Sequence, residues 1–270
     1  MTVTGGQQGT EQQHTASDSG STRWRGVGAS VVGTSHQTGG IPCQDAHYWQ
    51  IMTGDVLVAA VADGAGSALL AEVGAEIAAK SAVEAFCAKG NASGDDKAIR
   101  DSLNDALKEA QNAVKSEASA RQVDVSQLAT TLILVVATSE FVGAAQVGDG
   151  IAVVQGADGN IMGVTSPEGG EHVNETTFLN SHRNLKRAQL NVWRGIPTHV
   201  AILSDGLQRL ALKMPSGVPH SPFFAPLFTF VSNTPDSTQA QVQLEQFLNA
   251  PRITDNTTDD LTLVLFGLEP

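Results

Sequence analysis

Apolar and polar stretches follow one another along the 270 residues in an order that predicts a mixed fold. Apolar runs of strand length occur at 26–33, 56–63, 129–137, 141–149, 151–155, 161–164, 199–205 and 261–267. Apolar residues spaced by three and four predict helices over 69–86, 97–118 and 239–248. Because strands and helices do not alternate regularly, the pattern favours an α+β fold with mainly antiparallel sheets.

Two internal segments do not follow either period. Residues 166–194 are polar and irregular, and the sequence PHSPFFAPLF is rich in proline. Long connections of this kind are usually functional. Residues 1–22 are polar, with many Gly, Gln, Ser and Thr, so we expect a flexible leader followed by a single domain over 23–270.

Composition narrows the choice of partners and compartment. The chain is 41% hydrophobic, enough for a sizeable core, and its net charge is −12. An acidic surface repels phosphate backbones, which argues against nucleic acid or an anionic membrane as the main partner. Two cysteines, no secretion signal and no apolar run of membrane length predict a cytoplasmic protein.

Carboxylates recur where predicted strands end. The pairs are Asp63-Gly64, Asp149-Gly150, Asp205-Gly206 and, just before the last strand, Asp259-Asp260. One Asp-Gly pair alone is more often a turn, as we expect of Asp158-Gly159. Several strand ends can converge at the rim of a sheet, where clustered carboxylates need a cation. Hard oxygen ligands favour magnesium or manganese, and two such ions about 3.5–4 Å apart form a hydrolytic clamp.

The motifs carry a resemblance to a known family. LVAAVADGAGSALLAEVGAEIA, ATTL, QVGDG, LSDGLQRLAL and DNTTDDLTLVLF, in this order between residues 26 and 267, resemble the bacterial branch of the protein phosphatase 2C family. These are metal-dependent Ser/Thr phosphatases. VGTSHQTGGIPCQDA is similar to the opening motif of that branch. The resemblance implies a sandwich of two mainly antiparallel β-sheets flanked by helix pairs, with a metal site at one end.

The same resemblance implies roles for single residues. Asp63 would bridge two Mn²⁺ or Mg²⁺ ions, and a third ion is possible in the family. The other metal-site positions by match are Asp45, which would hold metal-bound water, the Gly64 carbonyl, Asp149 near the third ion, and Asp205 and Asp259. Asp63, Asp205 and Asp259 would then be catalytic, because water bridging the ions attacks phosphorus in line. Asp255 is the fallback for Asp259.

The opening motif departs from the family pattern at the substrate phosphate. An arginine usually stands where this chain has Gly40, so a different group must hold the phosphate. Ser35, His36 and Arg25 are the candidate substitutes for substrate binding. For His36, a structural role in capping the turn stays open as an alternative.

Two further departures concern proton transfer. Gln44 replaces an acidic residue, and Ala65 replaces a histidine that would protonate the leaving group. Loss of a general acid costs about 10²–10⁴-fold in rate unless metal-bound water or His36 takes the role. GGEHVNETTF resembles the flap of relatives and is expected to set substrate choice.

Other reactive side chains are interpreted as structural. Ser204 lacks a nucleophile-elbow sequence, Cys43 has no basic neighbour in sequence, and Thr130 and Thr131 fit buried strand hydroxyls.

The leading hypothesis is a monomeric phosphoprotein phosphatase that acts on substrates of a bacterial Ser/Thr kinase. The alternative is a catalytically weak phosphatase-fold protein that binds phosphorylated partners in a regulatory role. A calcium sensor built on DNTTDD is a third reading, but the spacing does not match an EF-hand loop.

Overall fold

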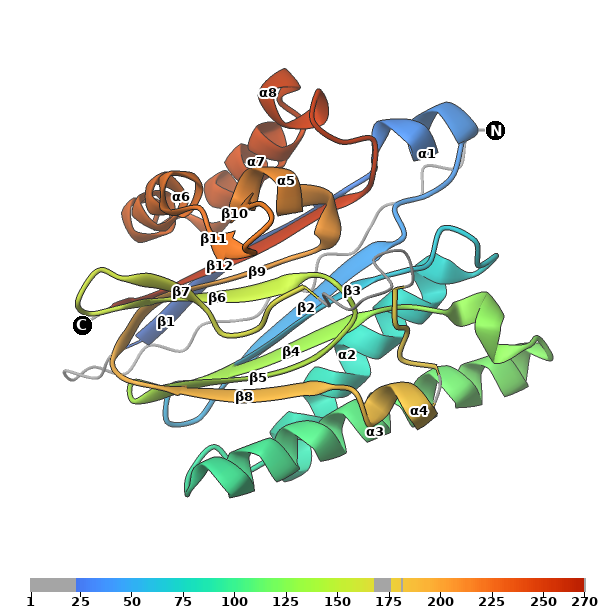
Figure 1. The fold of residues 1–270 in the computed structure, drawn as a ribbon, viewed down its shortest axis with the longest axis horizontal. Coiled ribbons are helices and arrows are strands. Elements are labelled where there is room, and N and C mark those ends of the chain that lie inside the picture. Colours follow the sequence, from blue (N-terminus) through green and yellow to red (C-terminus); the bar gives the residue numbers. More distant parts are fainter. Residues whose placement is uncertain (1–22, 168–175, 181, 270) are drawn as a thin grey trace.

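The structure is a computed structural model that describes residues 23–167, 176–180 and 182–269. The expected leader and most of the GGEHVNETTF segment lie outside the described residues. Figure 1 shows four layers, in which two β-sheets lie face to face and helices cover the outer face of each sheet. The predicted α+β fold with two mainly antiparallel sheets is therefore confirmed.

One sheet contains β2 (Asp45–Met52), β3 (Val56–Asp63), β4 (Leu132–Ala137), β5 (Phe141–Val147) and β8 (Gln189–Arg194), in the order β2-β3-β4-β5-β8. All neighbours are antiparallel. Successive side chains of β3 point to opposite faces. Val58 and Ala60 pack in the core beneath the helices, whereas Leu57, Ala59 and Val61 pack between the sheets.

The second sheet contains β1 (Arg23–Val31), β12 (Leu261–Glu269), β9 (Pro197–Leu203), β6 (Ile151–Gly156) and β7 (Ile161–Gly163), in the order β1-β12-β9-β6-β7. Its pairs are also antiparallel. Val264 and Phe266 of β12 face the first sheet, while Leu263 and Leu265 face the helices on the other side. β3 and β12 are thus buried on both faces along most of their length.

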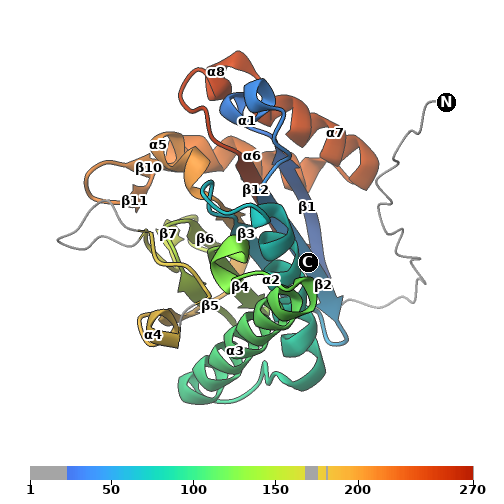
Figure 2. The same ribbon diagram turned by 90° about the vertical axis from the view of Figure 1, so that its right-hand side faces the viewer.

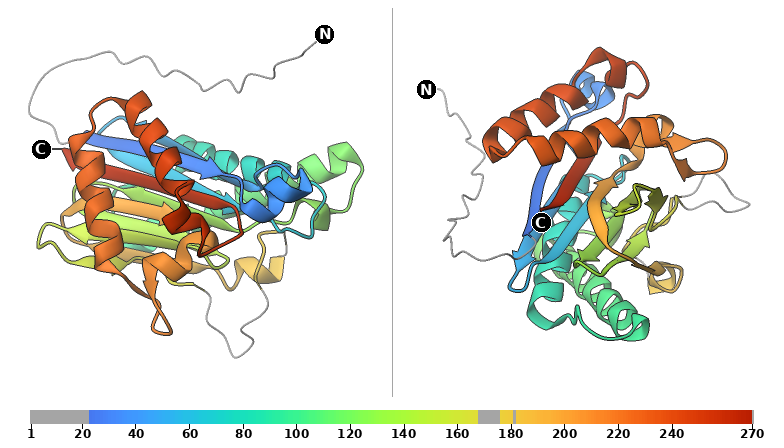
Figure 3. Two further views of the ribbon diagram at one scale, coloured as in Figure 1. Left: turned by 90° about the horizontal axis from the view of Figure 1, so that it is seen from above. Right: turned by 90° about the vertical axis from the view of Figure 1, so that its left-hand side faces the viewer.

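Two helix layers complete the sandwich, as the views in Figures 2 and 3 show. The long helices α2 (Ala71–Lys89) and α3 (Asp96–Arg121) cover the first sheet. The second sheet is covered by α6 (Ser221–Asn233) and α7 (Ser237–Leu248). Among the described residues, no helix is long and apolar enough to cross a lipid bilayer.

Short elements join these layers. They are α1 (Thr34–Gly39), η1 (Val125–Leu128), α4 (His182–Leu185), η2 (Asp205–Leu207), α5 (Gln208–Ala211), β10 (Leu212–Lys213), β11 (Val218–Pro219) and α8 (Pro251–Thr254). The expected turn at Asp158-Gly159 joins β6 to β7, and Gly159 has a φ of +80°.

The sequence pattern missed β2, β8 and α6, and it gave a turn where α1 forms. Strands β2 and β8 are edge strands whose side chains are mostly half-buried, so neither shows a continuous apolar run. In α6 the proline at the first turn fits helix geometry, and Pro226 inside the helix removes one hydrogen bond. Burial of Phe224, Leu227 and Phe228 offsets that loss.

The strand ends that carry carboxylates meet at one end of the sandwich. β3 ends at Asp63, and β5 and β9 end two residues before Asp149 and Asp205, respectively. The antiparallel partner of Asp63 across the ladder is Asp45, the first residue of β2. β12 begins immediately after the pair at 259–260.

Candidate metal centre

Three of the predicted carboxylates converge. One carboxylate oxygen from each of Asp63, Asp149 and Asp205 lies within 4.8 Å of the others. Asp63 is the last residue of β3 and Asp149 follows β5, both in the first sheet, whereas Asp205 follows β9 of the second sheet. The cluster therefore combines residues from both sheets. Oxygen donors at this spacing suit a magnesium or manganese ion.

Asp45 extends the cluster along β2. It stands opposite Asp63 in the ladder, and its carboxylate is almost completely buried. The Ser204 hydroxyl donates to Asp45 Oδ2 at 2.7 Å, and Ser204 Oγ accepts from the Thr262 amide at 3.0 Å. Ser204 is 1% exposed, so it holds Asp45 in place and is closed to an attacking role.

The electrostatics of the cluster are those of crowded acids. Burial, with lesser repulsion from Asp260 and Asp205, raises the pKa of Asp45 to about 8. Burial and then the charges of Asp45 and Asp205 raise the pKa of Asp63 well above its usual range. The pKa of Asp205 rises to about 6, first through burial and then through Asp149. Without a cation, protons must neutralise part of this charge.

The donor set fits a divalent cation. Asp205 Oδ1 is buried and has no hydrogen-bond partner in the described structure. An unpaired buried carboxylate oxygen is costly, and a bound cation removes that cost. The oxygen of the Gln44 side chain, next to Asp45, is also buried without a partner. The site therefore offers more oxygen acceptors than the chain itself satisfies.

The backbone fixes Asp63 from both sides. Thr131 Oγ1 accepts from the Asp63 amide at 3.0 Å, and the Asp63 carbonyl accepts from the Thr131 amide at 2.8 Å and from the Thr130 hydroxyl at 3.0 Å. Both threonines are buried, as predicted, but they precede β4 instead of lying within it. At Gly64 an added Cβ would lie 2.6 Å from the carbonyl oxygen of Ala71, so only glycine allows α2 to begin this close to the site.

Asp149 is held by two segments. Thr176 donates its hydroxyl proton to Asp149 Oδ2 at 2.9 Å, and the Gln208 side-chain amide donates to the Asp149 carbonyl. Thr176 belongs to the segment that resembles a flap, whereas Glu171 and Asn174 of that segment lie outside the described residues.

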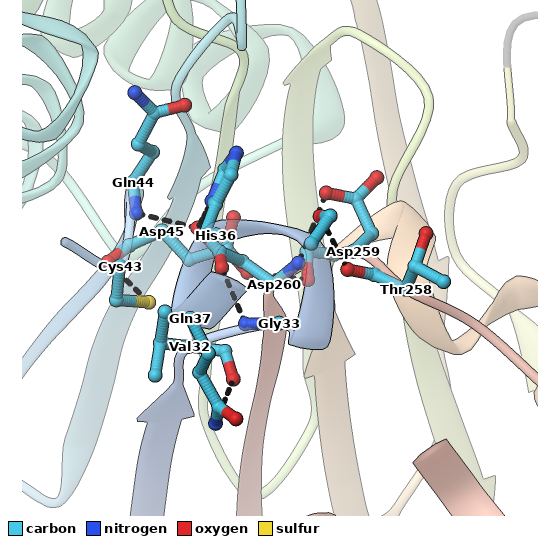
Figure 4. Close-up of polar contacts among 12 residues, drawn as sticks. Val32, Gly33, His36, Gln37, Cys43, Gln44, Asp45, Thr258, Asp259 and Asp260 are labelled. Carbon is cyan, nitrogen blue, oxygen red and sulfur yellow. Dashed lines mark hydrogen bonds and ion pairs between the residues drawn. The ribbon is translucent and has the colours of Figure 1, made fainter. Parts of the chain in front are cut away.

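The two neighbouring aspartates before β12 lie in different surroundings (Figure 4). Asp260 is 3% exposed; its Oδ1 accepts from the Gly33 amide at 2.6 Å, and its Oδ2 accepts from the Gln44 amide at 2.6 Å. Asp259 is exposed, and its charge helps to raise the pKa values of Asp63 and Asp205. Asp260 is thus engaged by the backbone, while Asp259 lies near the cluster.

The opening loop places the candidate phosphate ligands differently. His36 Nδ1 lies 3.0 Å from Asp260 Oδ2, as Figure 4 shows. Ser35 donates its hydroxyl proton to the Thr258 carbonyl at 2.6 Å, so it has no proton left for a phosphate. The prediction of Arg25 as a phosphate ligand is wrong. Arg25 lies in the first half of β1, near the end of the strand away from the site, and its guanidinium forms an ion pair with Glu269 at 2.7 Å.

The other departures have plain structural consequences. Gly40 has a φ of +66° and open space around it, so it contributes a turn and no side chain. Ala65 is buried and donates its amide to the Ala129 carbonyl at 2.9 Å. Burial, followed by the charge of Asp45, raises the pKa of the Cys43 thiol, which is therefore a poor nucleophile.

Sequence reasoning missed the roles of Asp260, Thr176 and Gln208. The pair Asp259-Asp260 was visible in the sequence, but which carboxylate turns into the protein depends on where Gly33 and Gln44 lie. Gln208 could have been found from the sequence, because it stands three residues after Asp205, at the start of the short helix α5.

Fold and site together define a two-sheet β-sandwich with a cluster of acidic side chains that could hold a metal ion, and comparison with known proteins identifies the family. A sequence profile described as "Protein phosphatase 2C" matches residues 32–249. Serine/threonine-protein phosphatase 3 of Escherichia coli (strain K12) is 34% identical over 252 residues, which cover 90% of this chain and 97% of that protein. The chain therefore belongs to the protein phosphatase 2C family.

Solved structures show the same fold. The serine/threonine phosphatase Stp1 from Staphylococcus aureus matches with a TM-score of 0.64 at 16% identity, over 97% of this chain and 100% of that chain. The catalytic domain of the serine threonine protein phosphatase PstP, in complex with two manganese ions, matches with a TM-score of 0.61 at 16% identity, over 93% and 100%.

Proposed function

We propose that this protein is a metal-dependent protein phosphatase that hydrolyses phosphoserine and phosphothreonine. The observation that carries the proposal is the convergence of Asp63, Asp149 and Asp205 at one end of a protein phosphatase 2C fold. The three acids are half-buried, and the pKa values of Asp63 and Asp205 are raised, first of all by burial. Clustered acids with raised pKa values are typical of a functional site rather than of a solvated surface.

Asp63 would hold two ions, with the Gly64 carbonyl, Asp205 and Asp259 as further ligands and Asp149 at a third, weaker position. When bound, divalent ions acidify water and neutralise charge on the phosphoryl oxygens. The Ser204 hydroxyl fixes one oxygen of Asp45, which orients that carboxylate to accept a proton from water beside the phosphate. The hydroxyl groups of Thr130 and Thr131 form hydrogen bonds with the backbone of Asp63 and so fix its position.

His36 is the side chain we propose for contact with the substrate phosphate. Its Nδ1 contacts Asp260, and Nε2 has no hydrogen bond within the described residues, so Nε2 is the ring nitrogen proposed to reach the phosphate. Ser35 supports this loop by donating to the carbonyl of Thr258, so a contact between Ser35 and the phosphate would require that hydrogen bond to break. The same His36 imidazole would protonate the leaving alkoxide, because Ala65 carries no proton donor.

The partners we propose are phosphorylated proteins, including substrates of a bacterial Ser/Thr kinase, in a cytoplasmic signalling role. We propose that the protein acts as a monomer. Manganese or magnesium would serve as the ion, since both prefer carboxylate oxygens.

The second candidate is a phosphatase-fold protein that binds phosphorylated partners with little turnover. The observations that favour it are Gly40 and Ala65, which remove the usual phosphate and leaving-group contacts. The clustered carboxylates favour the enzyme, because a phosphate-binding protein gains nothing from several mutually repelling acids.

A comparison of binding and turnover separates the two candidates. Purified protein with manganese is given a phosphothreonine peptide, and both phosphate release and peptide binding are measured. Release that stops with a chelator supports the enzyme. Saturable binding without release, or release that continues after chelation, contradicts it.

A further inference from the structure

A cavity of about 550 Å³ lies among the helices that cover the second sheet, away from the acidic cluster. Its walls come from α5, α6, α7 and α8, which lie together in the upper part of Figure 1. The volume is in the range of small-molecule sites. The α6 wall is formed by the proline-rich sequence that the family resemblance left without a role.

The walls are apolar and aromatic. Phe223 of α6 and Phe247 of α7 face the cavity with Leu210, Leu244 and Ile253. The rings of Phe223 and Phe247 contact each other, and their centroids are 6.4 Å apart. Such a lining favours the flat or linear apolar part of a ligand.

One charge defines the polar end of the cavity. Arg252 is exposed at the rim, and its guanidinium lies 5.1 Å from the centroid of the Phe247 ring. Within the described part of the chain, Arg252 forms no ion pair, and no residue that lines the cavity is acidic. In a protein of net charge −12, an arginine without a carboxylate partner beside an apolar cavity is complementary to an anion.

A second polar group in the wall has no partner. His220 lines the cavity, and its Nδ1 is buried without a hydrogen bond in the described structure. Buried ring nitrogens are normally paired, so this one marks a place where a ligand atom can complete the bonding. Arg252 and His220 thus offer two polar contacts to a mainly apolar ligand.

We propose that this cavity binds a small amphipathic carboxylate, with its apolar body between α6 and α7 and its carboxylate on Arg252. The cavity is separate from the acidic cluster in space, but some of its wall residues are close in sequence to residues of the cluster. Leu210 lies in the helix that follows Asp205, and α8 ends five residues before Asp259. Binding itself does not depend on the proposed phosphatase activity.

The test is isothermal titration calorimetry of 4-phenylbutyrate into the full-length, metal-free protein, with neutral 4-phenylbutanol as the matched compound. Arg252→Gln should weaken binding of the carboxylate about tenfold or more, because a charge-assisted hydrogen bond is lost. Arg209→Gln removes an exposed arginine that does not line the cavity, and it should bind as the unmodified protein does.

A second variant blocks the cavity without touching the core. Gln243 is an exposed wall residue, so Gln243→Trp should fill the space while the protein stays folded, and binding should be lost. No saturable binding to the unmodified protein would overturn the proposal. So would equal affinity for the alcohol and the carboxylate, or unchanged affinity after Arg252→Gln.

Discussion

Asp260 shows how a single carboxylate can organise a site through contacts with the backbone. Its two oxygens accept from the Gly33 and Gln44 amides, which belong to the segment before α1 and the residue before β2. Asp45 follows Gln44 directly, so the position of Asp45 depends on this contact. At Gly33 an added Cβ would lie 2.3 Å from the Asp259 carbonyl, which shows how tightly these segments pack.

We expect Asp260→Asn to destabilise the protein by about 2–4 kcal/mol. The asparagine side chain has one acceptor oxygen, whereas the Gly33 and Gln44 amides each need an acceptor. Denaturant unfolding of the metal-free protein measures this change. Asp255→Asn is the matched control, since Asp255 is an exposed carboxylate in the same loop. Equal stability of the two variants would show that Asp260 is not a structural clamp.

At the scale of elements, the approach of α2 to the rest of the fold depends on a small residue inside the helix. A Cβ on Gly74 would lie 2.4 Å from the carbonyl oxygen of Leu128, the last residue of η1. Helix propensity alone favours alanine over glycine by about 1 kcal/mol. The steric cost is larger, because the contact is with a backbone carbonyl that cannot rotate away.

Gly74→Ala should therefore lower the free energy of unfolding by about 1–3 kcal/mol in spite of its better helix propensity. Chemical denaturation measures the effect. Glu84→Ala changes an exposed position of the same helix and should leave stability within about 0.5 kcal/mol. A gain in stability for Gly74→Ala would mean that α2 packs less closely than described.

The elements that the sequence predicted are those with two buried faces or a regular apolar stripe. β3 has its predicted bounds, because both of its faces are buried and its side chains are therefore apolar. α3 was predictable because it buries a regular stripe that includes Ile99, Leu103 and Val114. β2 and β8 escaped notice because edge strands tolerate polar residues. The helix predicted over 69–86 begins at Leu69, but Leu69 is 82% exposed and precedes α2.

The candidate site was predictable to a similar degree. The strand-end pattern pointed to Asp63, Asp149 and Asp205, whose convergence is confirmed, whereas their roles as ligands stay predictions. The loop contacts were not predictable, because they depend on tertiary placement. No sequence pattern predicts that His36 contacts Asp260, or that Arg25 forms an ion pair at the end of β1 away from the site.

For the molecule as a whole, the acidic cluster links stability to pH. The pKa values of Asp45 and Asp205 are raised to about 8 and about 6, so the folded protein holds more protons than the unfolded chain between about pH 4 and 8. The stability from these protons is present at low pH and is lost as the pH rises through the folded pKa values. Bound cations would replace the protons and restore it.

Three consequences are measurable by thermal unfolding. The melting temperature of the metal-free protein should fall between about pH 5 and 8, and manganese should raise it more at pH 8 than at pH 5. At pH 8, Asp45→Asn should be more stable than the unmodified metal-free protein by about 1–3 kcal/mol. Asp105→Asn, at an exposed position of α3, should show no such gain. A pH-independent melting temperature would contradict the link.

The most direct test of the central claim is the rate of phosphate release from a phosphothreonine peptide as manganese is added to metal-stripped protein. The rate should be negligible without metal, rise to saturation with manganese, and fall by about 10²-fold or more at every concentration in Asp63→Asn. Circular dichroism confirms that this variant is folded. Release without added metal, or an unchanged rate in Asp63→Asn, would contradict the assignment of the acidic cluster as the catalytic metal centre.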